Sequence, residues 1–144
     1  MIHFSSTLDS TPESVDAAGV SVRRFTEEAG FDDSDTYFIA LAVHEVLVNA
    51  VKHGNRFDPN KKVELRLSAD ETRLIVEVND EGAGFCLESV PDPRLEENLA
   101  LPSGRGITIA RGIMDDFHVE SGSTGAYVRM SKTRERPVIG QPSP

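Results

Sequence analysis

Cysteine and long apolar runs are scarce in this chain, and each shortage excludes a class of protein. One cysteine, Cys86, stands among 144 residues, which rules out an internal disulfide framework and a cysteine-rich zinc site. No apolar run approaches the ~18 residues that a membrane-spanning helix requires. The opening residues, MIHFSSTLDS, lack the basic and apolar regions of a secretory signal. We therefore expect a cytoplasmic protein with no membrane association.

Basic residues are also outnumbered: 15 Lys and Arg stand against 24 Asp and Glu, for a formal net charge of −9. A protein that holds nucleic acid needs a basic face, so we expect no direct contact with nucleic acid. The length of 144 residues and the hydrophobic content of 38% fit one domain with one core. We expect that domain to cover residues 1–132, with the patternless segment 133–144 as a disordered tail.

Local patterns predict the order of helices and strands. A first helix is expected after Thr11, with Pro12 in its first turn and Gly30 as its stop. Apolar residues recur in it every three or four positions and predict one buried face, made of Val15, Ala18, Val22, Phe25 and Ala29. A second, more apolar helix begins near Ser34 or Asp35 and ends at Gly54. A further helix is predicted at 106–117, and strands are predicted at 2–8, 62–70, 72–80, 117–122 and 126–132. The segment 81–105 is rich in glycine and proline, and a loop this long in a compact domain is typical of a lid or binding loop.

Three polar residues interrupt the second helix at a strict interval. Glu45, Asn49 and His53 lie four residues apart, so on an α-helix they share one face. A carboxylate and an amide oxygen at this spacing suit a hard cation such as Mg²⁺, and the carboxylate also suits a general base. Alternatively, Glu45 pairs with His53 at a surface edge while Asn49 caps a neighbouring element. Spacing alone favours this second reading.

Two glycine-rich segments follow. In VNDEGAGF, Asp80 precedes Gly82 and Gly84 at the end of a predicted strand. Glycines at a strand exit let a flat ligand approach the backbone, and Asp80 suits a ligand amine; a plain Asp-Glu-Gly turn is the alternative.

In SGRGI, Gly104, Arg105 and Gly106 stand at the predicted start of a helix. Free backbone N–H groups and the helix dipole favour an anion there, and Arg105 suits a phosphate; a flexible hinge with a solvated arginine is the alternative. The chain contains neither a P-loop nor the Rossmann glycine fingerprint, so a nucleotide would be held in another way.

Taken in order, these motifs resemble those of the GHKL ATPases. The segment E-x-x-x-N-A-x-x-H-G at 45–54 resembles their N box, D-x-G-x-G-F at 80–85 their first glycine box, and G-R-G-I at 104–107 the second. Within that superfamily the chain is similar to the small anti-sigma-factor serine/threonine kinases over roughly residues 3–132. The resemblance implies a Bergerat fold. This is an α/β (α+β) two-layer sandwich with a mixed, mostly antiparallel sheet, helices on one face and an ATP lid at about 86–105.

The resemblance also implies roles for the site residues. Asn49 would ligate Mg²⁺ between the ATP phosphates, and Glu45 would be the general base that deprotonates a substrate hydroxyl. Asp80 would bind the adenine amino group. The other implied ATP-binding residues are His53, Gly82, Gly84, Gly104, Arg105 and Gly106. One departure from the family pattern is Ala126, which follows Gly125 where the family commonly has threonine.

The function implied is an ATP-dependent serine/threonine kinase that is also an anti-sigma factor in a partner-switching module. It would phosphorylate an anti-sigma-factor antagonist, sequester a sigma factor and form a homodimer. The alternative is a non-catalytic ATP-binding module that only holds a protein partner.

Overall fold

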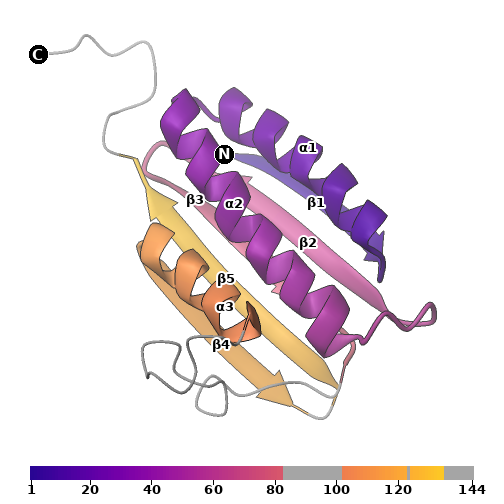
Figure 1. Ribbon diagram of the computed structural model, residues 1–144. Coiled ribbons are helices and arrows are strands. Elements are labelled where there is room, and N and C mark those ends of the chain that lie inside the picture. Colours follow the sequence, from indigo (N-terminus) through magenta and orange to yellow (C-terminus); the bar gives the residue numbers. More distant parts are fainter. Residues whose placement is uncertain (83–101, 123, 135–144) are drawn as a thin grey trace, which may run out of the picture.

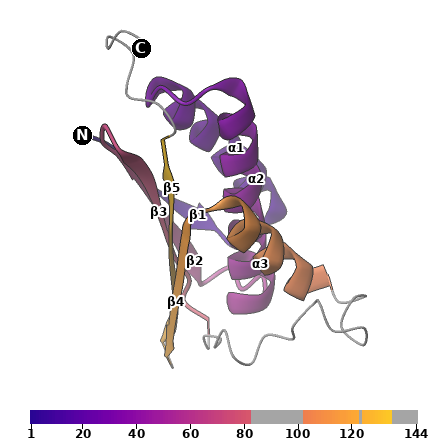
Figure 2. The same ribbon diagram turned by 90° about the vertical axis from the view of Figure 1, so that its left-hand side faces the viewer.

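The computed structural model describes residues 1–82, 102–122 and 124–134 of the chain as a two-layer sandwich (Figure 1). One layer is a five-stranded sheet in the order β1-β2-β3-β5-β4. Its strands are β1 (Ile2–Asp9), β2 (Lys62–Ala69), β3 (Arg73–Asn79), β4 (Asp116–Gly122) and β5 (Gly125–Thr133). The other layer holds α1 (Pro12–Glu28), α2 (Asp33–Asn49), the short π-helical turn η1 (Ala50–Gly54) and α3 (Pro102–Ile113). Figure 2 shows the sheet nearly edge-on, with the helices on one side of it.

Every neighbouring pair of strands in this sheet is antiparallel. The predicted two-layer α+β sandwich is confirmed, but the expectation of a mixed sheet is wrong for the described strands. The physical reason lies in the order of the strands, which separates those that run in the same direction. Strands β3 and β4 run in the same direction, yet β5 lies between them and pairs with both. In the same way, β2 separates β1 from β3.

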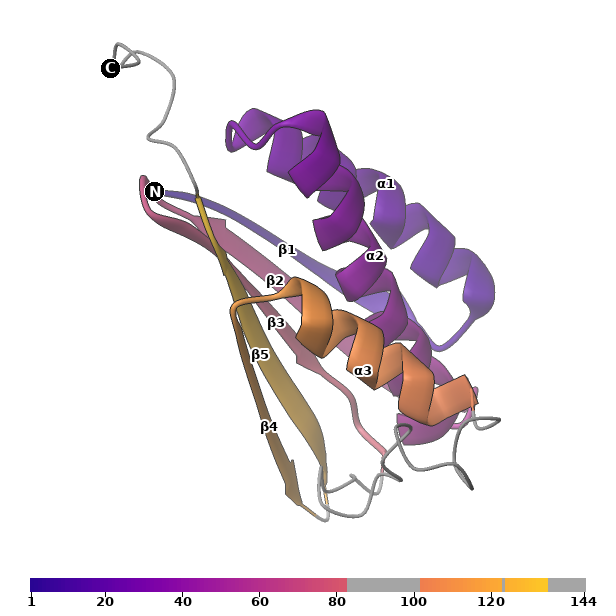
Figure 3. The ribbon, with the colours of Figure 1, turned by 60° about the vertical axis from the view of Figure 1, so that its left-hand side comes forward.

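The core lies between the two layers. Alternate residues of β2 and β3 point into it, as the period-two pattern predicts. The predicted apolar face of α1 is buried against the sheet, including Val15, Val22 and Phe25. Helix α2 lies between α1 and α3 and packs against both, which explains why it is apolar around most of its circumference (Figure 3). Among the described residues, no helix is long and apolar enough to cross a membrane.

The helix starts follow capping chemistry. Thr11 caps α1 by accepting a hydrogen bond from the Ser14 backbone N–H at 3.1 Å, and Pro12 is its first residue, as predicted. Helix α3 begins at Pro102 rather than at Gly106, so its predicted start is wrong. Proline fixes a helical φ and lacks an N–H, which suits the first position of a helix. The helix ends at Ile113, and the chain then turns into β4.

The last described residues belong to the fold. Strand β5 continues to Thr133, and the Arg134 side chain donates to the backbone oxygen of Asp70. The folded domain therefore extends beyond residue 132. The remainder of the predicted tail, 135–144, lies outside the described residues. Of the predicted lid, residues 86–101 also lie outside them, whereas its last residues belong to α3.

Candidate functional site

The second helix changes its hydrogen-bond pattern where the polar stripe is located. It is α-helical up to Asn49 and π-helical over Ala50–Gly54. The Asn55 N–H donates to the oxygen of Ala50 at 2.8 Å, which closes a turn one residue wider than an α-turn. Such turns occur frequently at functional sites. The predicted helix end at Gly54 is confirmed, but no local pattern in the sequence predicted the wider turn.

This change divides the stripe. Glu45 and Asn49 are half-buried on α2, whereas His53 is exposed on η1. Partial burial of its ring lowers the pKa of His53 from the usual value of 6.5, and the positive charge of Lys52 lowers it further. Among the described residues, neither the Glu45 nor the Asn49 side chain has a hydrogen-bond partner, and the alternative Glu45–His53 pair is not formed.

Asp80 lies directly after β3 and is only 7% exposed. Its Oδ1 accepts hydrogen bonds from the backbone N–H groups of Gly82 at 3.0 Å and Ala126 at 3.1 Å. Burial raises the pKa of this carboxyl, while those two bonds and the charge of Lys61 act in the opposite direction. Within the described part of the chain nothing donates to Oδ2, so this oxygen is available to accept from a ligand amine.

Glycines form a cradle around this carboxylate. A Cβ on Gly54 would meet Asp80 Oδ2 at 2.4 Å, and a Cβ on Gly82 would meet the backbone oxygen of Gly54 at 1.8 Å. Gly125 has a φ of +144°, and a Cβ on it would lie 2.0 Å from the backbone oxygen of Asp80. The last turn of η1, the Asp80 turn and the start of β5 therefore meet backbone to backbone. The sequence assigned Gly82 to the site but gave Gly54 only the role of a helix stop.

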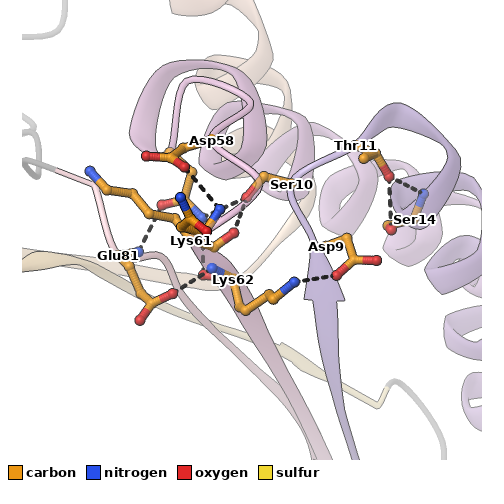
Figure 4. A network of polar contacts seen from close by, with 10 residues as sticks. Asp9, Ser10, Thr11, Ser14, Asp58, Lys61, Lys62 and Glu81 are labelled. Carbon is orange, nitrogen blue, oxygen red and sulfur yellow. Dashed lines mark hydrogen bonds and ion pairs between the residues drawn. The ribbon is translucent and has the colours of Figure 1, made fainter.

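Asn55 is a site residue that the sequence did not reveal. It is 1% exposed, and its Nδ2 donates to Ser10 Oγ and to the Lys62 oxygen, each at 3.0 Å. Its Oδ1 accepts from the Glu81 backbone N–H at 2.8 Å. Glu81 in turn accepts from the Lys62 backbone N–H, and Ser10, Lys62 and Glu81 are labelled in Figure 4. An asparagine after a helix-ending glycine reads as an ordinary turn residue, so only its long-range partners identify it.

The second glycine box is only partly visible. Gly104, Arg105 and Gly106 lie within α3 by its bounds, near the start of that helix. Their side-chain surroundings and Gly84 lie outside the described residues. The phosphate role given to these residues remains a prediction.

The residues present fit a nucleotide with a metal ion. No three His, Cys, Asp or Glu side chains gather as a metal site in the described ranges. A Mg²⁺ ion at Asn49 would therefore take its remaining ligands from phosphate and water, which is how this ion is usually held. The half-buried amide of Asn49, without a partner among the described residues, suits that role. The Oδ2 acceptor of Asp80, in its glycine cradle, suits the edge of a flat base.

Known proteins are similar to this chain in sequence. Residues 8–132 match the histidine kinase-like ATPase domain family. A serine-protein kinase RsbW of Bacillus licheniformis is 28% identical over 134 residues, covering 87% of this chain and 83% of that protein. An anti-sigma F factor of Geobacillus stearothermophilus is 31% identical over 106 residues, covering 72% of this chain and 73% of that protein.

A solved structure supports the fold independently. It contains the RsbU and RsbW domains of Rv1364c from Mycobacterium tuberculosis and superposes with a TM-score of 0.65 at 20% identity. The match covers 96% of this chain and 35% of that longer chain. At this identity the likeness concerns the fold alone.

Proposed function

Because the chain belongs to the histidine kinase-like ATPase domain family, we propose that it is an ATP-dependent serine/threonine kinase of a partner-switching module. Its substrate is an anti-sigma-factor antagonist, and it also sequesters a sigma factor. The observation that carries the proposal is the buried Asp80 carboxylate, whose Oδ2 faces the glycine cradle at the end of the helix bearing Glu45 and Asn49.

The names of the relatives support the two halves of this proposal. One is called a serine-protein kinase and another an anti-sigma F factor, and both match most of this chain. The resemblance further supports action in the cytoplasm and as a homodimer. A kinase that holds a sigma factor releases it when an unphosphorylated antagonist takes its place, and phosphorylation of the antagonist reverses the exchange.

Each residue has a defined task in the transfer. Asp80 Oδ2 accepts from the adenine amino group, and Asn49 holds Mg²⁺, which when bound neutralises phosphate charge. Glu45 takes the proton of the substrate hydroxyl, whose oxygen forms the new bond to the γ-phosphorus as the bond to the β-phosphate oxygen breaks. Positioning and charge stabilisation dominate such transfers, so removing Glu45 costs less than removing Asn49. His53, Gly82, Gly84 and the Gly104–Gly106 segment contact the nucleotide.

The test incubates the purified chain with labelled ATP, Mg²⁺ and the antagonist-type proteins of its own genome. Wild type is expected to label one serine or threonine, located by mass spectrometry. Asn49→Ala should lose transfer, Glu45→Gln should lose less, and Asn60→Ala, in an exposed turn, serves as a matched control. If ATP binds but no antagonist is labelled, the kinase assignment fails and the non-catalytic ATP-binding module takes its place.

A further inference from the structure

The Asp80 turn reads the base through one oxygen, so its position must be fixed accurately. Asp80 is bound from one side by the backbone of Ala126. The Ala126 N–H donates to Asp80 Oδ1, and the Ala126 oxygen accepts from the Asp80 backbone N–H at 3.0 Å. These bonds join the turn to β5. They leave the other side, toward the end of α2, to be fixed by different contacts.

On that other side the turn meets η1. A Cβ on Gly82 would lie 1.8 Å from the Gly54 oxygen, so the two backbones touch without an intervening side chain. A contact between two glycines excludes atoms but sets no direction. The next residue, Asn55, supplies a direction to the backbone of the turn, because its Oδ1 accepts from the Glu81 N–H at 2.8 Å, while the Glu81 side chain accepts from the Lys62 N–H.

The orientation of the Asn55 amide is determined by its partners. The Glu81 N–H can only donate, and the Lys62 backbone oxygen can only accept. The oxygen of the amide must therefore face Glu81 and its nitrogen must face Lys62 and Ser10. At 1% exposure, water cannot replace these bonds, so losing one of them is costly.

We propose that Asn55 is a positioning residue for the Asp80–Gly82 turn and thereby sets the preference of the site for adenine. It ties the end of the helix that carries Asn49 to the turn that reads the base. Base and phosphate recognition are thus held in one fixed geometry. This inference rests on the proposed function, specifically on Asp80 accepting from the adenine amino group.

The experiment compares ATP with inosine triphosphate, which has the same triphosphate but lacks the amino group. Calorimetry with Mg²⁺ should show that wild type binds ATP on the order of 10- to 100-fold more tightly, the penalty for an unpaired acceptor. In Asn55→Ala this preference should fall to about threefold, with binding of inosine triphosphate changed less than about threefold. In the kinase assay, the KM for ATP should rise about tenfold while kcat stays within about twofold.

Two further variants separate positioning from folding. Asn55→Asp keeps an oxygen for the Glu81 N–H but loses both donated bonds, so it should lower the melting temperature and retain the preference for ATP. Ser10→Ala removes one partner of the amide and keeps the Glu81 contact, so it should also retain the preference. Should Asn55→Ala fail to fold, Asn55→Ser takes its place, because its shorter side chain no longer reaches the Glu81 N–H, and it should lose the preference that Asn55→Asp retains.

The outcomes are distinct. If wild type shows no preference for ATP over inosine triphosphate, the role of Asp80 in the proposed function fails and the inference falls with it. If wild type has the preference but Asn55→Ala weakens both ligands equally, or Asn55→Asp loses the preference, Asn55 is merely structural and the inference is overturned.

Discussion

Two aspartates at opposite ends of β3 have similar local sequences, yet one is bonded within its own turn and the other is the residue we propose to bind the base. Asp70 precedes the strand and Asp80 follows it, and each is followed by a glutamate. Asp70 Oδ1 accepts from Thr72 N, Thr72 Oγ1 and Arg73 N at 2.8 to 2.9 Å, all within its own turn. These bonds lower its pKa to about 2.

Asp80 is the opposite case. Its donors come from Gly82 and from the distant Ala126, both on Oδ1, and burial raises its pKa. Among the described residues both carboxylates accept through Oδ1 alone, but the donors to Asp70 all lie within its own turn, whereas Asp80 is buried and one of its donors comes from another strand. A buried carboxyl whose pKa is raised is typical of a binding site.

The surroundings differ in the same sense. Near Asp70, Arg134 donates to its backbone oxygen at 3.1 and 2.9 Å and lies 4.5 Å from the centre of the Phe31 ring, which joins the α1–α2 loop to the sheet. Near Asp80, glycine backbones meet instead of side chains. We therefore expect substitutions at the Asp70 end to change stability, and substitutions at the Asp80 end to change nucleotide binding.

The largest expected effect is that of Gly82→Ala. The added methyl group would overlap the Gly54 oxygen, so the turn must move away from η1. A displacement of this size costs on the order of 100-fold or more in ligand affinity. Calorimetry with ATP measures it. Gly19→Ala in α1, where a Cβ meets nothing within 4 Å, is the control and should keep full affinity while gaining about 1 kcal/mol of stability. Equal ATP affinities of Gly82→Ala and wild type would contradict a close contact between Gly82 and Gly54.

Matched Asp→Asn substitutions test the comparison directly. Asp80→Asn places a donor where an acceptor is needed, so ATP affinity should fall on the order of 10- to 100-fold. Asp70→Asn should leave ATP affinity unchanged and lower the melting temperature, because its turn loses a charged acceptor. Titration calorimetry and thermal unfolding of both variants measure the two effects. A result in which both variants lose affinity alike would remove the distinction between the two ends.

Arg134→Ala should affect stability alone. It removes the bonds to the Asp70 oxygen and the contact with Phe31, for an expected loss of about 1–2 kcal/mol in the free energy of unfolding. Urea unfolding measures this, with the exposed Arg24→Ala in α1 as the control. ATP affinity should be unchanged. A loss of ATP affinity would show that the contacts of Arg134 with Asp70 and Phe31 influence the nucleotide site.

The smallest effects are the pH dependences, which have opposite signs. The low pKa of Asp70 adds stability above its ordinary value of 3.8, and this contribution is lost as the pH falls toward 2. Asp80 has a raised pKa, so its contribution is full below 3.8 and is lost as the pH rises through the folded-state value. Unfolding of wild type, Asp70→Asn and Asp80→Asn from about pH 2 to about pH 7 should show the two trends. Parallel curves would show that neither group is shifted.

The sequence was most informative where local rules decide the structure. The three-four periodicity of Val15, Ala18, Val22 and Phe25 predicted the buried face of α1, and alternation predicted the strands. The motif around Asp80 placed this residue at a strand end, which the structure confirms. In these cases the signal and its cause lie within the same few residues.

Other features depend on partners far along the chain. Asn55 is important because of Ser10 and Glu81, and Gly54 because of Asp80, and none of these pairings leaves a local pattern. Asp70 and Asp80 look alike in sequence apart from the glycine after the second, so their opposite pKa shifts follow only from burial and from the donors that the fold supplies.

The π-turn at Ala50–Gly54 makes the site depend on chain length as well as on side chains. Each residue of an α-helix rotates the chain by about 100°. Deleting one residue here would let the α-helical pattern continue and would swing Gly54 away from Asp80. A substitution in this segment alters one contact, whereas a single-residue deletion would misplace the whole junction between helix and sheet. Laboratory evolution of this protein should therefore accept replacements of the exposed Lys52 but no insertion or deletion between Ala50 and Gly54.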